Sequence, residues 1–179
     1  MKKAFTMLEL IFVIVIIGIL AAVIIPNTRS NPTAEAATKL MAHLRYTQHL
    51  ALIDDKYDGT ANAFRDRWQV RFTGDTYSIV NDNNTSYATS PSDRQTPMKD
   101  IDLNKDYGVT VTFQGTQCLG QSIISFDYLG RPFVGDLSAN ANPYDSLMTN
   151  ADCEIEISYG AETATVAIQP ETGYASVSF

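Results

Sequence analysis

The sequence is poor in the residues on which most enzyme chemistry depends. It has only two histidines and two cysteines among 179 residues, and it contains no G-x-S-x-G, H-E-x-x-H or phosphate-binding glycine-loop motif. His43 and His49 are six residues apart on an expected helix, about 240° around its axis, so they do not share a face. We therefore expect neither catalysis nor a two-histidine metal site, and we expect both histidines to be solvated or helix-capping.

Positive charge is scarce in the second half of the chain. Arg131 is the only basic residue in 106–179. The acidic residues there are Asp106, Asp127, Asp136, Asp145, Asp152, Glu154, Glu156, Glu162 and Glu171. Such a region repels phosphates, so nucleic acid is not an expected partner. A small basic patch of Arg65, Arg67 and Arg71 surrounds Trp68, but Asp66 lies within it.

Charge is also nearly absent near the N-terminus, where Glu9 is the only charged residue between Phe5 and Ile25. A helix of this length spans roughly 31 Å, which matches a bilayer core of about 30 Å. Pro26 ends the run, so residues 5–26 predict a membrane-spanning helix. An ordinary secretory signal is the alternative, and the mature chain would then begin at Val23.

Glu9 needs a partner, because a carboxylate inside a membrane is costly and by default functional. No Lys, Arg or His lies within the apolar run, and Lys2 and Lys3 precede it. If the chain were cut after Ala4, the new amino group of Phe5 would lie about 6 Å along the helix axis from Glu9. A neighbouring copy shifted by about one turn would then place its own amine against this carboxylate, and assembly would neutralise both charges.

The basic leader, the segment Phe5-Thr6-Met7-Leu8-Glu9 and the apolar helix ending at Pro26 resemble the processing signal of type IV pilin-like proteins, which include pilins, minor pilins and the pseudopilins of type II secretion. The resemblance implies that a prepilin peptidase cuts between Ala4 and Phe5 and methylates the new amine. It also implies that Glu9 recruits the subunit into a filament and that Pro26 kinks the helix. The family usually has glycine before the cut, where this chain has Ala4.

The same resemblance implies partners and a location. The partners are other pilin or pseudopilin subunits, prepilin peptidase, the inner-membrane assembly platform and membrane lipid. The short basic leader should remain cytoplasmic, so the protein would cross the bacterial inner membrane once, with its head in the periplasm, before it enters a filament at the cell surface.

After the apolar run, Asn31 and Pro32 have the character of a helix N-cap and first helical position. Apolar residues then recur at spacings of three, four and seven; they are Ala37, Leu40, Met41, Leu44, Ala51 and Leu52. We therefore expect the chain to divide into a leader at 1–4, a transmembrane and assembly helix at 5–26, an amphipathic helix at 27–54 and a β-rich head at 55–179.

From residue 68 the pattern changes to a period of two. "WQVRF" and "TYSIV" flank Thr73-Gly74-Asp75 and predict a hairpin, and the last three strands, "CEIEISY", "ATVAIQP" and "YASVSF", predict an antiparallel meander. Residues 81–106 are rich in turn formers and are expected to form a long exposed loop. The fold class is therefore α+β: a long N-terminal hydrophobic and amphipathic helix packed on an antiparallel sheet, a pilin-like roll.

Three segments of the head resemble the H-type minor pseudopilins and their minor-pilin relatives. These segments are Trp68-Gln69-Val70, Phe126 to Pro132, and the closing "VAIQPETGYASV". Asp127 and Gly130 are interpreted as parts of an ordinary β-turn.

Cys118 and Cys153 would lie in an oxidising compartment if the head is exported. An even pair there favours a disulfide, with two free thiols as the alternative.

A weaker pattern is the acidic segment that contains Asp100, Asp102, Asn104 and Asp106. On a strand these residues would project oxygens from one face, as calcium prefers. The calcium-loop pattern fails, however, because Lys105 stands where glycine is needed. We therefore expect no cofactor, with calcium as a minor alternative to a solvated acidic edge.

The sequence as a whole predicts a structural subunit of a type IV pilus or a type II secretion pseudopilus, and the acidic head favours a minor subunit. Three alternatives stay open: a major pilin, a DNA-uptake minor pilin and a monomeric membrane-anchored binding module.

Overall fold

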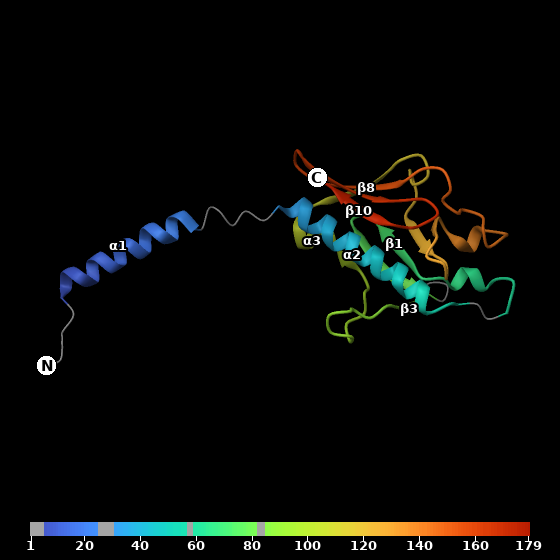
Figure 1. The fold of residues 1–179 in the computed structure, drawn as a ribbon, viewed down its shortest axis with the longest axis horizontal. Helices are drawn as coiled ribbons and strands as arrows, with labels where there is room; N and C mark the ends of the chain where they lie inside the picture. The colour runs from blue at the N-terminus through green and yellow to red at the C-terminus, as the bar shows by residue number, and fades with distance from the viewer. Residues whose placement is uncertain (1–5, 25–30, 57–58, 82–84) are drawn as a thin grey trace. The chain divides into compact units, whose positions relative to one another are not determined.

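The computed structural model of the chain describes residues 6–24, 31–56, 59–81 and 85–179. The chain divides into two compact units, 1–31 and 32–179. The first contains one helix, α1 (Met7–Ile24), and the second contains the helix α2 (Pro32–Ile53) and all ten strands (Figure 1). α1 and α2 lie within the helices expected at 5–26 and 27–54, and α2 begins at the proline that the sequence indicates.

α2 buries the stripe that its sequence predicts. Thr33, Ala36, Ala37, Leu40, Leu44, Thr47 and Ala51 are buried along it. Met41 is half-buried, whereas Leu52 is 51% exposed. The expectation for Leu52 was wrong because it is one residue beyond Ala51, about 100° away around the helix from the buried face.

The head has two antiparallel sheets where the sequence indicated one. The six-stranded sheet has the order β3-β2-β1-β6-β7, and β4 also pairs with β2. The four-stranded sheet has the order β10-β9-β8-β5. The strands of the first sheet are β1 (Gln69–Thr73), β2 (Thr76–Asn81), β3 (Ser86–Tyr87), β4 (Ile101–Asp102), β6 (Ile123–Phe126) and β7 (Pro132–Val134). Those of the second are β5 (Thr110–Gln114), β8 (Cys153–Tyr159), β9 (Glu162–Ile168) and β10 (Ala175–Ser178).

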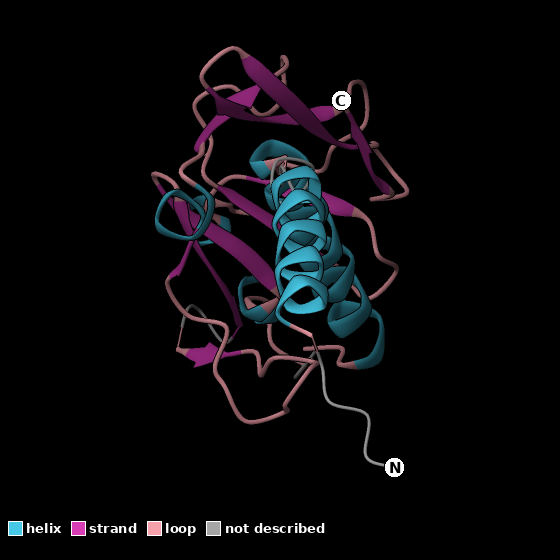
Figure 2. Ribbon diagram, turned by 90° about the vertical axis from the view of Figure 1, so that its left-hand side faces the viewer, coloured by secondary structure: helices cyan, strands magenta, loops and turns pink. Residues whose placement is uncertain are grey.

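The predicted hairpin and the predicted meander are both present. β1 pairs with β2 around Gly74 and Asp75, and β8, β9 and β10 pair in chain order. Figure 2 shows the two sheets as separate groups of magenta strands. Between β4 and β5 the short helix α3 (Leu103–Tyr107) ends at Gly108, whose φ of 74° redirects the chain. This turn carries β5 away from the first sheet to pair with β8.

Both sheets share α2 as a common packing surface. The helix contacts β8, β9 and β10 of one sheet and β1 and β6 of the other. Its Leu40 and Leu44 belong to a single cluster with Val70 and Ile124 of the first sheet and Ile155 of the second. The head is therefore α+β with one helix packed on antiparallel sheets, which is the predicted class. The long N-terminal helix of a pilin-like roll stays a prediction, because the described residues form two separate helices, α1 and α2.

The segment 81–106 is more structured than the exposed loop that was expected. Ala88 and Met98 are buried. The N–H of Ala88 donates to Ile79 O, the N–H of Ile79 donates to Met98 O, and the N–H of Met98 donates to Ala88 O. The two buried apolar side chains hold the described part of this segment against β2 and account for the difference.

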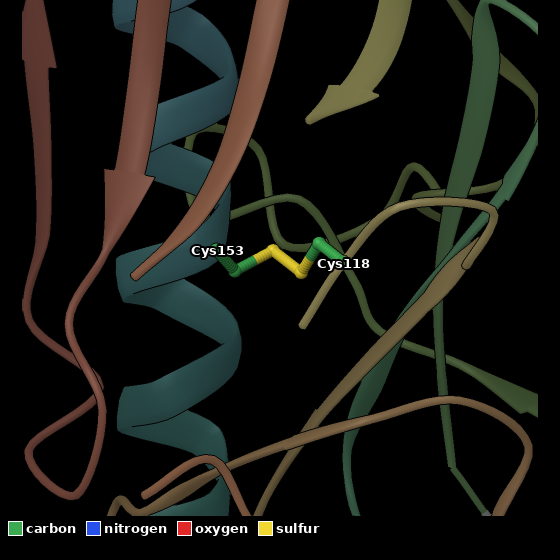
Figure 3. Close-up of a disulfide and its surroundings, with 2 residues drawn as sticks. All are labelled: Cys118 and Cys153. Atoms are coloured by element: carbon green, nitrogen blue, oxygen red, sulfur yellow. A yellow bond between two sulfur atoms is a disulfide. The ribbon is translucent and has the colours of Figure 1, made fainter. Parts of the chain in front are cut away.

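Cys118 and Cys153 form the predicted disulfide (Figure 3). Their Cα atoms are 5.2 Å apart and their sequence separation is 35. Both residues are fully buried, and the bond fixes the segment after β5 to the first residue of β8. A closed loop of this length contributes roughly 3 to 4 kcal/mol in the loop-entropy description.

A polar junction, formed by two hydrogen bonds from Gln48, connects two turns to α2. The Nε2 of Gln48 donates to the carbonyl oxygens of Gly130 (2.9 Å) and Thr172 (2.8 Å). Gly173 lies in this junction with φ +65°, and a Cβ there would approach Gly130 O and lie 2.7 Å from Gln48 Nε2. Only glycine fits this position, because the φ is left-handed and the space is already occupied.

Gly173→Ala should therefore destabilise the head by about 3 kcal/mol, combining the left-handed backbone cost with overpacking. The matched control is Gly160→Ala, where φ is +62° but nothing lies within 4 Å. It should cost only about 1 kcal/mol. Urea unfolding of both variants followed by fluorescence compares them. Equal destabilisation would show that crowding at Gly173 is unimportant.

Candidate functional site

Glu9 lies in the first turn of α1, in a helix that is otherwise apolar. Its backbone N–H donates to Thr6 O (3.1 Å) and to Thr6 Oγ1 (3.3 Å). Thr6 and Glu9 are thus three residues apart at a helix start, the arrangement of a capping box. A carboxylate in this turn also interacts favourably with the helix dipole. Both local effects support the helix start, but a glutamine would satisfy the capping box equally well.

The described side chains of α1 are apolar apart from Glu9. Every described side chain from Thr6 to Ala21 is exposed; Met7 is 86% exposed and Leu8 79%. A helix that is apolar on all sides requires burial in a membrane or in a larger assembly. Within the part of the chain that the structure describes, no helix has the length and hydropathy needed to cross a bilayer.

The remaining processing and assembly residues cannot be placed. Ala4, Phe5 and Pro26 lie outside the described residues.

The four residues of the acidic segment do not converge, and each has a local role. Asp102 caps α3 by accepting from Lys105 N, and Asp106 pairs with Lys39 at 2.9 Å. Asn104 Nδ2 donates to Val109 O, and the backbone N–H of Asp100 donates to Ser78 Oγ. The four residues do not share a strand, because α3 begins at Leu103. Among the described residues, no group of three or more His, Cys, Asp or Glu could hold a metal ion.

His43 is partly buried and bonded, in contrast to the solvated histidine that was expected. Its Nδ1 shares a hydrogen bond of 2.6 Å with the hydroxyl of Tyr77, and the two rings meet edge to face. Burial, assisted by the nearby Lys39, lowers the pKa of His43 to about 4. Burial also raises the pKa of Tyr77. The sequence missed this pair because the partner comes from β2, a different element.

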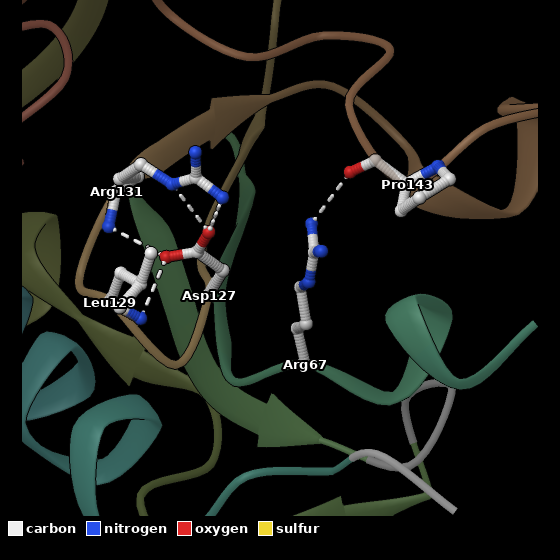
Figure 4. Close-up of polar contacts among 5 residues, drawn as sticks. All are labelled: Arg67, Asp127, Leu129, Arg131 and Pro143. Carbon is white, nitrogen blue, oxygen red and sulfur yellow. Dashed lines mark hydrogen bonds and ion pairs between the residues drawn. The ribbon is translucent and has the colours of Figure 1, made fainter. Parts of the chain in front are cut away.

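Asp127 is the most deeply placed charge of the head, and the expectation of an ordinary β-turn understated its role. It is fully buried, and its carboxylate accepts from Leu129 N, Arg131 N and Arg131 Nε (Figure 4). Arg131 Nη2 completes an ion pair at 2.7 Å. Because four donors surround one buried carboxylate, the charge is compensated and the β6–β7 turn is fixed.

The three arginines of the basic patch form hydrogen bonds or an ion pair with other residues of the head. Arg65 Nη2 donates to Asn140 O, and Arg67 Nη1 donates to Pro143 O at 3.0 Å. Arg71 lies 3.6 Å from Asp136. These contacts fix the loop after β7 to β1 and to the segment before it, which leaves less charge for binding phosphates than the sequence suggested.

A cleft of about 840 Å³ lies beside the C-terminal end of α2. Its apolar lining includes Ala51, Phe64, Trp68, Phe126, Tyr128 and Tyr144. Its polar lining includes Asp54, Asp55, Lys56, Arg67 and Asn142. Mixed apolar and polar walls of this size are typical of ligand sites. No sequence pattern indicated the cleft, since its lining comes from four separate segments.

Comparison with known proteins identifies no relative, because no protein-family model, no curated protein and no solved structure matches this chain.

The lowered pKa of His43 predicts a pH dependence of stability. The unfolded chain binds a proton at His43 below about pH 6.5, whereas the folded head does so only below about pH 4. The free energy of unfolding should therefore fall as the pH drops from 6.5 to 4, by about 1 to 3 kcal/mol, and this contribution should be constant above pH 6.5.

Urea unfolding at a series of pH values measures this slope. His43→Gln should flatten it over that interval, whereas His49→Gln, which changes an exposed histidine, should leave it unchanged. An unchanged slope in His43→Gln would contradict the assignment.

Proposed function

We propose that this chain is a structural subunit, a minor pilin or pseudopilin, of a type IV pilus or a type II secretion pseudopilus. In this proposal prepilin peptidase cuts between Ala4 and Phe5, the apolar helix holds the protein in the inner membrane, and Glu9 recruits it into the filament. The long helix of a pilin would correspond to α1 and α2 together.

The observation that carries the proposal is α1 itself. It has apolar residues on every side, one carboxylate in its first turn, and no Lys, Arg or His between Thr6 and Ile24. Burying each Leu, Ile or Val contributes about 1.5 to 3 kcal/mol. Burial of the whole helix therefore favours association with lipid or with other helices by an amount on the order of tens of kcal/mol.

Lipid alone leaves Glu9 without an opposite charge. A bundle of staggered copies supplies one, because the processed amine of one subunit would lie against Glu9 of its neighbour. Filament assembly accounts both for the apolar surface and for the single charge within it. A plain membrane anchor accounts only for the first.

Two of the alternative functions, a DNA-uptake subunit and a monomeric binding module, have unequal support from the head. A DNA-uptake subunit has little support, because Arg65, Arg67 and Arg71 bond within the head. A monomeric anchored binding module is favoured by the cleft beside α2. Such a module would keep residues 1–4 and would tolerate the loss of Glu9.

Three single variants separate the charge of Glu9 from its capping role. Glu9→Gln keeps the capping box but removes the charge, Glu9→Asp keeps the charge, and Thr6→Ala removes the cap and keeps the charge. Cells expressing each variant are fractionated into membranes and sheared filaments. Loss of a charge-assisted pair costs about 1.5 to 3 kcal/mol, so Glu9→Gln should enter filaments at least about tenfold less than the parent chain.

Membrane insertion and N-terminal processing should be normal in all three variants, and Thr6→Ala should still assemble. Normal incorporation of Glu9→Gln would contradict the proposal, and failure of Thr6→Ala alone would assign Glu9 and Thr6 a capping role only.

A further inference from the structure

Two cationic side chains, Lys56 and Arg67, line the cleft beside α2, and they differ in whether a carboxylate pairs with them. Lys56 Nζ lies 2.8 Å from Asp54 Oδ2 and 5.5 Å from the centre of the Trp68 ring. Asp54 also accepts a hydrogen bond from Trp68 Nε1 at 2.9 Å. The carboxylate of Asp54 therefore compensates the ammonium charge of Lys56 and also accepts the hydrogen bond from Trp68.

Arg67 is the other cation, and the described part of the chain gives it no ion pair. Its hydrogen bond goes from Nη1 to the neutral carbonyl of Pro143, and its guanidinium stacks over the ring of Phe133 at 4.4 Å. The loss of hydration on burial lowers the pKa of Arg67. A guanidinium has five N–H donors in a planar fork, so most of its capacity is not used by Pro143.

The nearby carboxylate of Asp127 does not fill this role. Figure 4 shows it turned toward Arg131 and Leu129, with the Arg67 side chain directed to Pro143 instead. Because Asp127 already accepts from four donors, its charge is committed to the β6–β7 turn. Arg67 is therefore a half-buried cation that lines an aromatic cleft and forms no ion pair with a described residue. The carboxylates of Asp127 and Asp55 attract its charge only from a longer range.

We propose that this cleft is a binding site for a carboxylate carried on an aromatic or branched aliphatic body, with Arg67 as the group that recognises the carboxylate. The apolar body would lie against Trp68 and Phe64, with the half-exposed Tyr128 and Tyr144 at the rim. The planar guanidinium matches a carboxylate with two parallel N–H···O bonds. The proposal is independent of filament assembly.

A single negative charge suits the site better than a double one. Asp54 and Asp55 line the same cleft as Arg67. A phosphate monoester, with its charge of nearly −2 at pH 7, would meet more repulsion there than a carboxylate would. The site therefore predicts a preference for monoanions over dianions.

Trp68 makes the test direct, because it is the one tryptophan of the chain and it lines the cleft. The full chain in maltoside micelles is titrated with 3-phenylpropionate, with 3-phenylpropionamide and with phenyl phosphate, while the Trp68 emission is followed. The carboxylate should bind at least about tenfold more tightly than the isosteric amide, the ratio expected for a charge-assisted hydrogen bond. Phenyl phosphate should bind more weakly than the carboxylate.

The variants Arg67→Gln and Arg67→Lys test the assignment of the charge. Arg67→Gln should abolish the preference for carboxylate over amide, and Arg67→Lys should retain part of it because the charge remains but the fork is lost. The matched control is Arg71→Gln, which removes a cation that lies outside the cleft and pairs with Asp136. This control should bind as the parent chain does.

Two ligands that present the carboxylate differently distinguish its source. N-acetyl-Asp-Phe amide presents it as part of a peptide, and 3-phenylpropionate presents it as a free acid. Tighter binding of the peptide would assign the site to an acidic, aromatic segment of a partner protein, and tighter binding of the free acid to a small metabolite. Equal affinity of the parent chain for 3-phenylpropionate and its amide, or no change in Trp68 emission with any ligand, would overturn the proposal.

Discussion

The central constraint is α1, an 18-residue helix that is apolar on every side and carries one carboxylate. From Thr6 to Ala21 every described side chain is exposed. The core of the head consists of residues beyond Pro32. An apolar surface like that of α1 requires burial in a membrane or in an assembly. The proposed function identifies that cover as lipid first and other subunits afterwards.

The head is built around a second helix that serves two sheets at once. α2 presents Leu40 and Leu44 to strands of both sheets, and Gln48 joins the β6–β7 and β9–β10 turns through two backbone carbonyls. The disulfide fixes the segment after β5, and the buried Asp127 adds further bonds within the β6–β7 turn. The cleft forms where α2 ends, so its walls depend on this arrangement. The proposed assembly through α1 and the proposed recognition through the head involve different residues, so mutations can test them separately.

Sequence patterns predicted the features that depend on residues close together along the chain. The start of α2 at Pro32, the hairpin around Gly74, the meander of β8 to β10 and the disulfide all follow from capping, periodicity or pairing, and the structure confirms them. The division into two sheets, the bond between His43 and Tyr77 and the cleft depend on which distant elements meet. One sequence does not specify those contacts. Asp100 to Asp106 do not share a strand for a local reason, because the side chain of Asp102 caps a helix that begins at Leu103.

The most direct test of the central claim is the intact mass and N-terminal residue of the protein purified from native membranes. The account predicts a chain that begins at Phe5 with a methylated amino group, since only processing supplies the cation that Glu9 lacks. A chain that begins at Met1 would contradict this and leave an anchored module. A chain that begins at Val23 would mean that the apolar run is a cleaved secretory signal and that no filament subunit is made.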